Sequence, residues 1–596
     1  HARRAPAGTR TAGSFFRNME KEHGTEFPVI RGAWPDWWTD GFGASARETS
    51  VTRKAAVSFI AGTGALSMAS LAGMKMPEGT SERIDLINSA LLFYTEHTTG
   101  YSESVREPYS QPTMEQRALK ESYAWEANRR TAALGEDAMG LLQGLFRREK
   151  DPSLIVFNTL NWKRSGMVTV YIDHQIVPMG STAGVFDETG NRFPSQPLSS
   201  RSDGTYWAIW IDDIPAFGYR KFFIRPMIDQ NLTVIKDPQS VLENKWYKIA
   251  ADLSKGSITS LYDKELSLEL RDQGSEYGIG DFILEQLGNR SQMESHKLID
   301  YKRVSLDTVW FDSFNKGPVF NSIRFYGETE TAIKPRGFSI EIRLYNNEKK
   351  IEIVCSIIKK SIVTPESFYI AFPFGLRDGK HFTEVQGGVI ETGKDQIKGS
   401  SNDWYTVQNF TAVRNRTSQI VFSCNEMPLM QFGAINTGRY SAGAMPESTH
   451  IFSWPMNNYW VTNFNAEQRG GHTWSYFITS SDDASNPFAT RFGWGSRVPF
   501  LTRILPGEGT GDNNFEGSFI TGWPENVLLI SSRPANGGIL LHLRETAGKK
   551  AIIDLKDGLN GRKLNTSVSD IAGNVTGDSS ATIGPFESKF FLIVEN

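Results

Sequence analysis

The segment Phe338-Ser339-Ile340-Glu341-Ile342-Arg343-Leu344-Tyr345 alternates apolar and polar side chains along its whole length. The same alternation returns shortly afterwards in Ile351-Glu352-Ile353-Val354. A period of two residues is typical of antiparallel strands that bury one face. Similar β-branched segments, separated by turn residues, continue from Asp151 to Val594. The sequence therefore predicts an α+β protein that is mostly β.

The residues before Asp151 differ in composition and in the spacing of apolar side chains. Between residues 45 and 150, Ala, Leu, Met and Glu dominate, and apolar residues recur at helical spacing over Ile84–Leu92. The stretch Tyr123–Phe146 is amphipathic in the same way. We expect three or more helices here, packed as a bundle. In the first 45 residues we expect strand and loop, around the apolar run Phe27–Ile30.

The chain has 596 residues, which is enough for several domains with sizeable cores. Its β-rich part is far longer than one ordinary sandwich of about 100 residues, so we expect two or three antiparallel β domains. Runs rich in Gly, Pro and Asn suggest the domain boundaries. The predicted units are a short N-terminal segment (1–45), a helical bundle (46–150), a small β domain (151–235), a large β-sandwich (236–500) and a C-terminal β domain (501–596).

Composition excludes several classes of protein. Lys and Arg number 64 and Asp and Glu 67, so the net charge is −3 and gives no global attraction to nucleic acid or to an anionic membrane. The two cysteines, Cys355 and Cys424, exclude a disulfide framework and a cysteine-based zinc cluster. One disulfide stays possible, and both a cytoplasmic and a periplasmic or extracellular location stay open.

Two segments bear on membranes and targeting. Ala55–Met74 carries no charge, but its glycines, serines and threonine lower its hydropathy, so we favour a buried bundle helix over a membrane span. His1–Arg10 is basic and has no apolar stretch, which is not typical of a signal peptide. We therefore expect no membrane partner.

Several catalytic motifs are missing. None of the nine histidines occurs in His-x-His, His-x-Asp or His-Glu-x-x-His spacing, so the sequence shows no local zinc motif. It also contains no Gly-x-x-x-x-Gly-Lys loop and no Gly-x-Ser-x-Gly elbow. Nucleotide chemistry and serine-hydrolase chemistry are therefore disfavoured.

The loop from Gly32 to Gly41 holds three tryptophans and two carboxylates. Trp37 and Trp38 could stack on sugar rings, Asp40 could accept hydrogen bonds from sugar hydroxyls, and Asp36 could act as acid or base. Equally, the tryptophans could form a domain interface and an aspartate could cap a helix. The composition of the loop does not decide between these two interpretations.

His97 follows an apolar helical segment and precedes a polar turn that ends in Gly100. A histidine at such a helix end can face a neighbouring domain. One possible metal ligand is not evidence of a metal site, so by itself His97 is interpreted as a solvated or hydrogen-bonded side chain.

Asn457–Phe464 and Asp403–Phe410 are rich in amides and aromatic rings. They suit a glycan, but we favour a structural role in which amides bind the backbone of irregular loops.

A series of short motifs runs through nearly the whole chain. It comprises Phe27-Pro28-Val29, Trp34-Pro35-Asp36-Trp37-Trp38, Glu96-His97-Thr98, Val156-Phe157-Asn158-Thr159-Leu160, Ile214-Pro215-Ala216-Phe217-Gly218-Tyr219, Leu242-Glu243-Asn244, Phe372-Pro373-Phe374, Pro428-Leu429-Met430-Gln431-Phe432-Gly433, Asn457-Asn458-Tyr459-Trp460 with Thr462-Asn463, and Leu541-His542-Leu543-Arg544-Glu545. In this order the motifs resemble the class II α-mannosidase-like proteins of glycoside hydrolase family 38, in a bacterial-looking branch.

This resemblance implies a catalytic α/β barrel, a three-helix bundle and β-sandwich domains, in that order. Residues 1–45 would be the C-terminal end of the barrel, and most of the barrel would be missing from this chain. The implied chemistry is retaining hydrolysis of α-mannosides, with an aspartate nucleophile and a zinc ion that binds sugar hydroxyls. His97 matches the zinc ligand that comes from the helical region. The other ligands and the nucleophile belong upstream, so the zinc site would be incomplete here.

The Trp-rich loop departs from the family pattern. Relatives often carry an acid where this chain has Ala33, and a tryptophan where it has Thr99. Asp36 is retained and is the candidate acid/base. A retaining glycosidase needs two carboxyl groups about 5–5.5 Å apart, and this loop could supply only one of them. We therefore expect the isolated chain to be inactive.

Three functions stay open at this point. The chain could be the bundle and β portion of an α-mannosidase, a non-catalytic relative that binds an α-mannoside or related glycan, or a structural β-sandwich protein. The ordered motifs argue against the third. The sequence does not give the glycan, its linkage or the oligomeric state.

Overall fold

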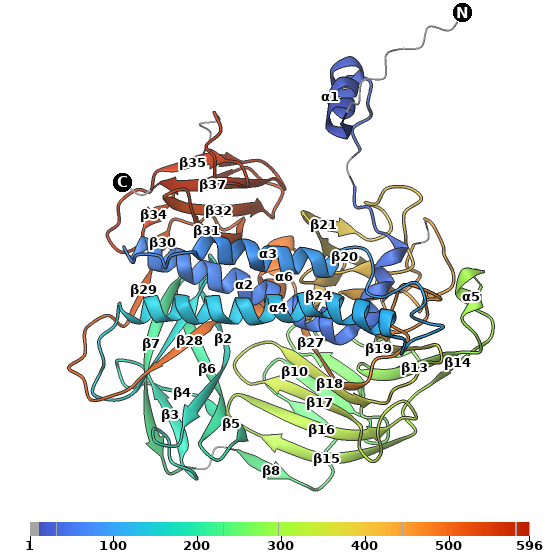
Figure 1. Cartoon of the computed structure of the whole chain (residues 1–596). Coiled ribbons are helices and arrows are strands. Elements are labelled where there is room, and N and C mark those ends of the chain that lie inside the picture. Colours follow the sequence, from blue (N-terminus) through green and yellow to red (C-terminus); the bar gives the residue numbers. More distant parts are fainter. Residues whose placement is uncertain are drawn as a thin grey trace, which may run out of the picture.

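The computed structural model describes residues 11–30, 32–229, 232–295, 297–443, 445–577 and 581–594. Helices come first and are followed by many antiparallel strands, so the α+β, mostly β fold expected from the sequence is confirmed (Figure 1). The segment His1–Arg10, considered above for targeting, lies outside the described residues.

The N-terminal residues form helices where the sequence suggested strand and loop. The first elements are α1 (Ala12–His23) and the 3₁₀ helix η1 (Trp37–Ser45). Thr11 caps α1 by accepting a hydrogen bond from Ser14 N at 3.2 Å. The run Phe27–Ile30 is not a strand and is exposed. The expectation of strand was wrong because a short apolar run finds no partner strand here, and strands form only in pairs.

The bundle consists of α2 (Ala46–Leu71), α3 (Thr80–Thr95) and α4 (Gln111–Gln143). The turn between α2 and α3 contains Gly73 and Gly79, which both adopt positive φ. Gly62 of α2 lies against Gly135 of α4, where a Cβ would stand only 3.7 Å from the Gly135 Cα. Small residues therefore let these two helices approach closely.

Helix α2 contains most of the uncharged segment Ala55–Met74. Together with η1 it forms a helical stretch, Trp37–Leu71, that is long and apolar enough to cross a membrane, and 61% of its most apolar window is buried inside the protein. Ala61, Ala65, Leu66 and Met68 are almost fully buried. The uncharged segment therefore lies mostly in a buried helix of the bundle, as predicted from the sequence.

The small β domain follows the bundle. Its strands are β1 (Ser153–Asn158), β2 (Arg164–Asp173), β3 (Thr182–Phe186), β4 (Arg192–Phe193), β5 (Ser195–Ser200), β6 (Gly204–Ile214) and β7 (Gly218–Met227). One sheet has the order β28-β1-β7-β3-β4 with β29 beside β7, and the other has the order β2-β6-β5. The strands β28 (Leu501–Leu505) and β29 (Glu516–Ser518) come from beyond the large sandwich and complete the first sheet.

The large sandwich contains the segment that opened the sequence analysis. Its strands are β8 (Thr233–Ile235), β9 (Val241–Glu243), β10 (Tyr247–Ala251), β11 (Ile258–Asp263), β12 (Leu268–Glu269), β13 (Asp281–Leu287), β14 (Tyr301–Val304), β15 (Thr308–Lys316), β16 (Phe320–Glu328), β17 (Phe338–Tyr345), β18 (Ile351–Lys359), β19 (Glu366–Phe372), β20 (Lys380–Val385), β21 (Gly388–Glu391), β22 (Tyr405–Thr406), β23 (Thr411–Arg414), β24 (Gln419–Cys424), β25 (Leu429–Phe432), β26 (Ile451–Asn457) and β27 (Gly470–Ser481), with the short helix α5 (Ser291–Glu294).

Strand β17 buries alternate side chains, as its sequence pattern predicted. Its apolar residues enter a core shared by the two main sheets, whose orders are β21-β20-β23-β24-β27-β18-β17-β16-β15-β8 and β14-β13-β19-β26-β25-β22. On the other face of β17, Arg343 pairs with Glu341 at 2.8 Å and with Glu352 at 3.3 Å. The alternation is thus hydrophobic toward the core and charged away from it.

The C-terminal part begins with α6 (Asn486–Arg497) and the strands already placed in the small β domain. The remaining strands are β30 (Ile520–Thr521), β31 (Val527–Ala535), β32 (Gly538–Glu545), β33 (Ala551–Ile552), β34 (Lys556–Asp557), β35 (Thr566–Ser569), β36 (Thr582–Ile583) and β37 (Ser588–Val594). The sheet β31-β32-β37-β35 packs on the bundle, and its Leu541 shares a core with Leu66 and Leu134 (Figure 1).

The two cysteines are free and buried. In the sheet, Cys355 of β18 lies opposite Trp474 of β27, and Cys424 of β24 lies opposite Tyr476 of β27. The cysteines therefore lie on the two strands that flank β27. A whole strand therefore separates them, and the disulfide that the sequence left possible is not formed.

Candidate functional site

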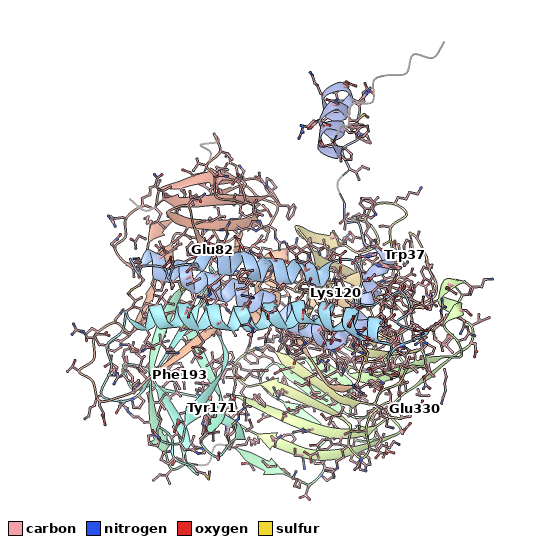
Figure 2. The ribbon with its side chains drawn as sticks, viewed as in Figure 1. Trp37, Glu82, Lys120, Tyr171, Phe193 and Glu330 are labelled. Carbon is pink, nitrogen blue, oxygen red and sulfur yellow. The ribbon has the colours of Figure 1, made fainter. Side chains whose placement is uncertain are left out.

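The 3₁₀ helix η1 carries the Trp-rich loop to the junction between the bundle and the large sandwich. It packs against β26 and the start of α2, and Ala33 pairs with Gln396 through a β-bridge. Figure 2 shows Trp37 at the end of the bundle that adjoins the large sandwich. All five residues singled out from the sequence lie at this junction or at the adjoining end of α3.

Asp36 is the N-cap of η1. Its Oδ1 accepts a hydrogen bond from Trp38 N at 2.7 Å, and its backbone oxygen accepts one from Thr39 Oγ1 at 2.7 Å. The side chain is exposed. The capping role that the sequence left open is therefore present, and an acid/base role for the same exposed carboxylate stays a prediction.

Trp37 is half-buried and joins the loop to the large sandwich. Its Nε1 donates to Asp403 Oδ2 at 2.6 Å, and its backbone oxygen accepts a hydrogen bond from Trp404 Nε1 at 3.0 Å. Burial raises the pKa of Asp403, and the Trp37 hydrogen bond opposes this increase. The indole N–H is thus occupied by the protein, and the predicted contact of Trp37 with sugar stays a prediction.

Trp38 is the centre of an aromatic cluster formed by Trp38, His97, Trp460 and Phe464. The His97 ring stacks on the Trp38 ring at 6.1 Å between centroids, and Trp460 and Phe464 lie at 4.7 and 5.4 Å. His97 is exposed and Trp38 is half-buried. The Trp38 Nε1 is buried and has no partner among the described residues. The cluster offers flat apolar faces with one unused N–H donor.

Asp40 lies beneath this cluster and is fully buried. Its Oδ1 accepts a hydrogen bond from Trp460 Nε1 at 2.5 Å, whereas its Oδ2 has no partner among the described residues. Burial raises the pKa of Asp40 well above its ordinary value, so the carboxyl keeps its proton to a higher pH than a free aspartic acid does. Asp40 supports the cluster from inside, and its predicted contact with sugar stays a prediction.

Residues outside the predicted set hold the loops of the site in place. Asn457 Nδ2 donates to the Asp40 backbone oxygen at 2.9 Å, and Gly100 N donates to Asn463 O at 2.7 Å. The Asn457–Phe464 segment thus acts partly through backbone contacts, in line with the structural role favoured from its amides.

Lys120 of α4 was not indicated by the sequence. Its ammonium is buried at the C-terminal end of α3, where it donates to Phe93 O at 2.7 Å and to Glu96 O (Figure 2). A cation at a helix C-terminus satisfies the unpaired carbonyl groups and interacts favourably with the helix dipole. Lys120 thereby fixes the turn that carries His97.

Zinc does not fit the described residues by themselves. Within the ranges given above, no group of three or more His, Cys, Asp or Glu side chains could hold a metal ion. His97 could supply one ligand, whereas a zinc site needs three or four. We therefore derive no chemical step through zinc, and its role stays a proposal from the resemblance.

Comparison with known proteins identifies the large sandwich. Residues 242–420 match the model of the glycosyl hydrolases family 38 C-terminal domain. This part of the chain is therefore similar to the C-terminal domain of family 38. The matched range runs from β9 into β24 and includes Asp403 and Trp404, the partners of Trp37. The family 38 resemblance stated from the sequence is thus confirmed.

Two solved structures have the same fold as this chain. An α-mannosidase from Enterococcus faecalis superposes with a TM-score of 0.69 at 13% identity, covering 97% of this chain and 72% of that protein. A glycosyl hydrolase family 38 protein from Enterococcus faecalis gives 0.70 at 12% identity, covering 97% and 73%. A search of curated protein sequences found no match.

The raised pKa of Asp40 has a measurable consequence. Its folded pKa lies above its unfolded value, so the unfolded state loses the proton first and stability falls as pH rises from about 4 toward the folded pKa. We expect Asp40→Asn to remove this loss. The variant should gain stability relative to wild type between pH 4 and pH 7, by about 1.4 kcal/mol for each unit by which the pKa is raised.

The measurement is urea unfolding of both proteins across this pH range. Asp252→Asn is the matched control with the opposite sign, because hydrogen bonds from Ser254 lower the pKa of Asp252. That variant should be less stable than wild type by a nearly constant amount from about pH 5 to pH 7, and the difference should shrink as pH falls below about 4. An Asp40→Asn difference that is flat with pH would show that Asp40 is ionised in the folded protein.

Proposed function

We propose that this chain is the glycan-binding part of an α-mannosidase-type glycoside hydrolase, and that it does not hydrolyse mannosides on its own. The observation that carries the proposal is the aromatic cluster around Trp38, beside the buried carboxyl of Asp40, whose pKa is raised. Flat aromatic faces beside uncharged polar groups suit a neutral sugar. Similarity to family 38 makes an α-mannoside the natural choice of sugar.

The absence of turnover follows from the carboxylates of the loop. Retaining hydrolysis needs an ionised nucleophile and an acid/base about 5–5.5 Å apart, both in contact with the sugar. Asp40 is fully buried, its pKa is raised and its Oδ1 is bonded to Trp460, so we do not assign it as the nucleophile. Asp36 is exposed and is the one carboxylate of η1 and its cap that we assign as a possible acid/base.

The first test is binding and turnover of an aryl α-mannoside by the whole chain. We expect saturable, weak binding and no hydrolysis. Trp38→Ala should weaken binding roughly two- to tenfold, because aromatic stacking contributes about 0.5–1.5 kcal/mol beyond burial. Trp310→Ala is the control, since Trp310 is a partly exposed tryptophan on β15, in another part of the molecule.

The outcomes separate the alternatives. Turnover that a chelator abolishes would contradict the claim that the chain is inactive and would support a complete zinc enzyme. Equal affinity in the Trp38 and Trp310 variants would move the sugar site away from η1. No binding at all would favour the structural β-sandwich protein, in which the Trp37 and Asp36 contacts serve only to join domains.

A further inference from the structure

A cavity lies where the small β domain, the large sandwich and α6 meet, and no residue of η1 lines it. Its volume is about 750 Å³. Its walls come from the start of β2, the turn between β17 and β18, and the C-terminal end of α6 with the residues that follow it. A cavity of this size holds a small organic ligand. None of the residues of the mannoside proposal lines it.

Three arginines line this cavity without an acidic partner. Arg164, Arg491 and Arg497 form no ion pair with any described residue. Arg164 donates to the backbone oxygens of Gly495 and Val498 at 2.7 and 2.9 Å. These acceptors are neutral, so no carboxylate contacts the guanidinium directly, and Glu348 of the same wall acts on it only through space.

Arg497 is buried as deeply as Arg164, which is also 7% exposed. Arg497 is 7% exposed, its Nη1 donates to Gln408 O and Asn409 Oδ1 at 2.7 and 2.6 Å, and its Nε is buried with no partner among the described residues. Burial lowers the pKa of Arg497, and lowers that of Arg164 to about 10. In both cases loss of solvation is the main cause, and the nearby carboxylates, Glu348 for Arg164 and Glu384 and Glu426 for Arg497, offset it only in part.

The other charges of the cavity wall are already paired. Lys349 pairs with Asp263 and Glu265, each at 2.8 Å, and Lys350 pairs with Glu348 at 2.5 Å. Glu352 is held by Arg343 at 3.3 Å. The three arginines therefore give the cavity an excess of positive charge, whereas the exposed Lys163 at its rim pairs with Asp213 at 3.6 Å.

Aromatic rings share the wall with these cations. The guanidinium of Arg164 lies 4.1 Å from the centroid of the Phe500 ring, and Trp162, Phe488 and Phe492 are half-buried along the same cavity. Rings and arginines together suit a ligand with an apolar face and an oxyanion. We propose that this cavity binds a small saccharide that carries a phosphate or carboxylate group, with the oxyanion on the arginines.

The test uses the whole chain and calorimetric titration with glucose 6-phosphate, glucuronate, inorganic phosphate and glucose. We expect at least one of the two anionic sugars to bind at least about tenfold more tightly than glucose and than inorganic phosphate. Which of the two binds more tightly decides between phosphate and carboxylate. If neither binds more tightly than glucose, the proposal is overturned. If inorganic phosphate binds as tightly as the sugar phosphate, the saccharide part is wrong.

Variants locate the site. Arg491 is exposed, so Arg491→Gln and Arg491→Glu should fold normally, weaken binding of the anionic sugar about tenfold, and do so more strongly for the charge reversal. Arg562→Gln removes an exposed arginine from the C-terminal part and serves as the matched control. Unchanged binding in Arg491→Glu, with the melting temperature of wild type, would overturn the assignment to this cavity. Trp38→Ala should leave this binding unchanged, which separates it from the mannoside proposal.

Discussion

Replacement of Glu384 by alanine is expected to destabilise the protein by about 3–5 kcal/mol, the largest effect we predict for a single substitution. Glu384 lies on β20 and is 1% exposed. Its Oε1 accepts hydrogen bonds from Arg544 and, at 3.0 Å, from Trp494 Nε1, and its Oε2 accepts one from Asn409 N at 3.1 Å. Its removal would leave the buried guanidinium of Arg544 without a counter-charge.

The position of Glu384 explains why the effect should be global. Arg544 belongs to β32, Trp494 to α6 and Glu384 to the large sandwich, so one carboxylate joins three parts of the chain. We expect the urea midpoint of the whole protein to fall in one transition. Glu384→Gln keeps the shape and part of the hydrogen bonding, so its loss should be smaller than that of alanine.

The control for this prediction is Glu126→Ala. Glu126 pairs with Arg129 and Arg130 on the surface of α4, and such exposed pairs contribute little. Its unfolding midpoint should match that of wild type. Equal midpoints for Glu384→Ala and wild type would show that water or movement of Arg544 compensates for the lost carboxylate.

Asn458→Ala is expected to cost about 2–4 kcal/mol and to weaken mannoside binding as well. Asn458 is 4% exposed. Its Nδ2 lies within hydrogen-bond distance of three backbone oxygens, those of Ala466 at 2.7 Å, Thr364 at 3.0 Å and Ile362 at 3.3 Å, and its Oδ1 accepts a hydrogen bond from Glu366 N at 2.7 Å. Alanine would leave these buried backbone groups without partners.

The effect on binding follows from the loop that Asn458 supports. Residues 458–468 carry Trp460 and Phe464, both in contact with Trp38. We expect the aryl α-mannoside affinity of Asn458→Ala to fall at least as far as that of Trp38→Ala, with unfolding and binding measured on the same protein. Asn347→Ala is the control, because Asn347 is exposed and makes one long hydrogen bond. A stability loss without an affinity loss would show that the loop does not depend on this amide for its conformation.

Local patterns in the sequence determined much of the architecture. The alternation of Phe338–Tyr345 predicted β17 and the face that it buries, and helical spacing predicted the bundle. These predictions succeed because side-chain periodicity depends on the geometry of one element and on which face is covered. The same kind of local signal made capping by Asp36 a stated alternative, and the structure has that cap.

Only the tertiary structure decided which residues form the sites. Trp460 meets Asp40 across a separation of 420 residues, and Lys120 reaches the end of α3 from the next helix. Strand β28 completes the sheet of β1, although the large sandwich lies between them in the sequence. The three arginines of the cavity likewise come together from β2 and α6. Such partners are not encoded in local spacing, because they depend on how whole sheets and helices pack, and packing brings together groups that are distant in the chain.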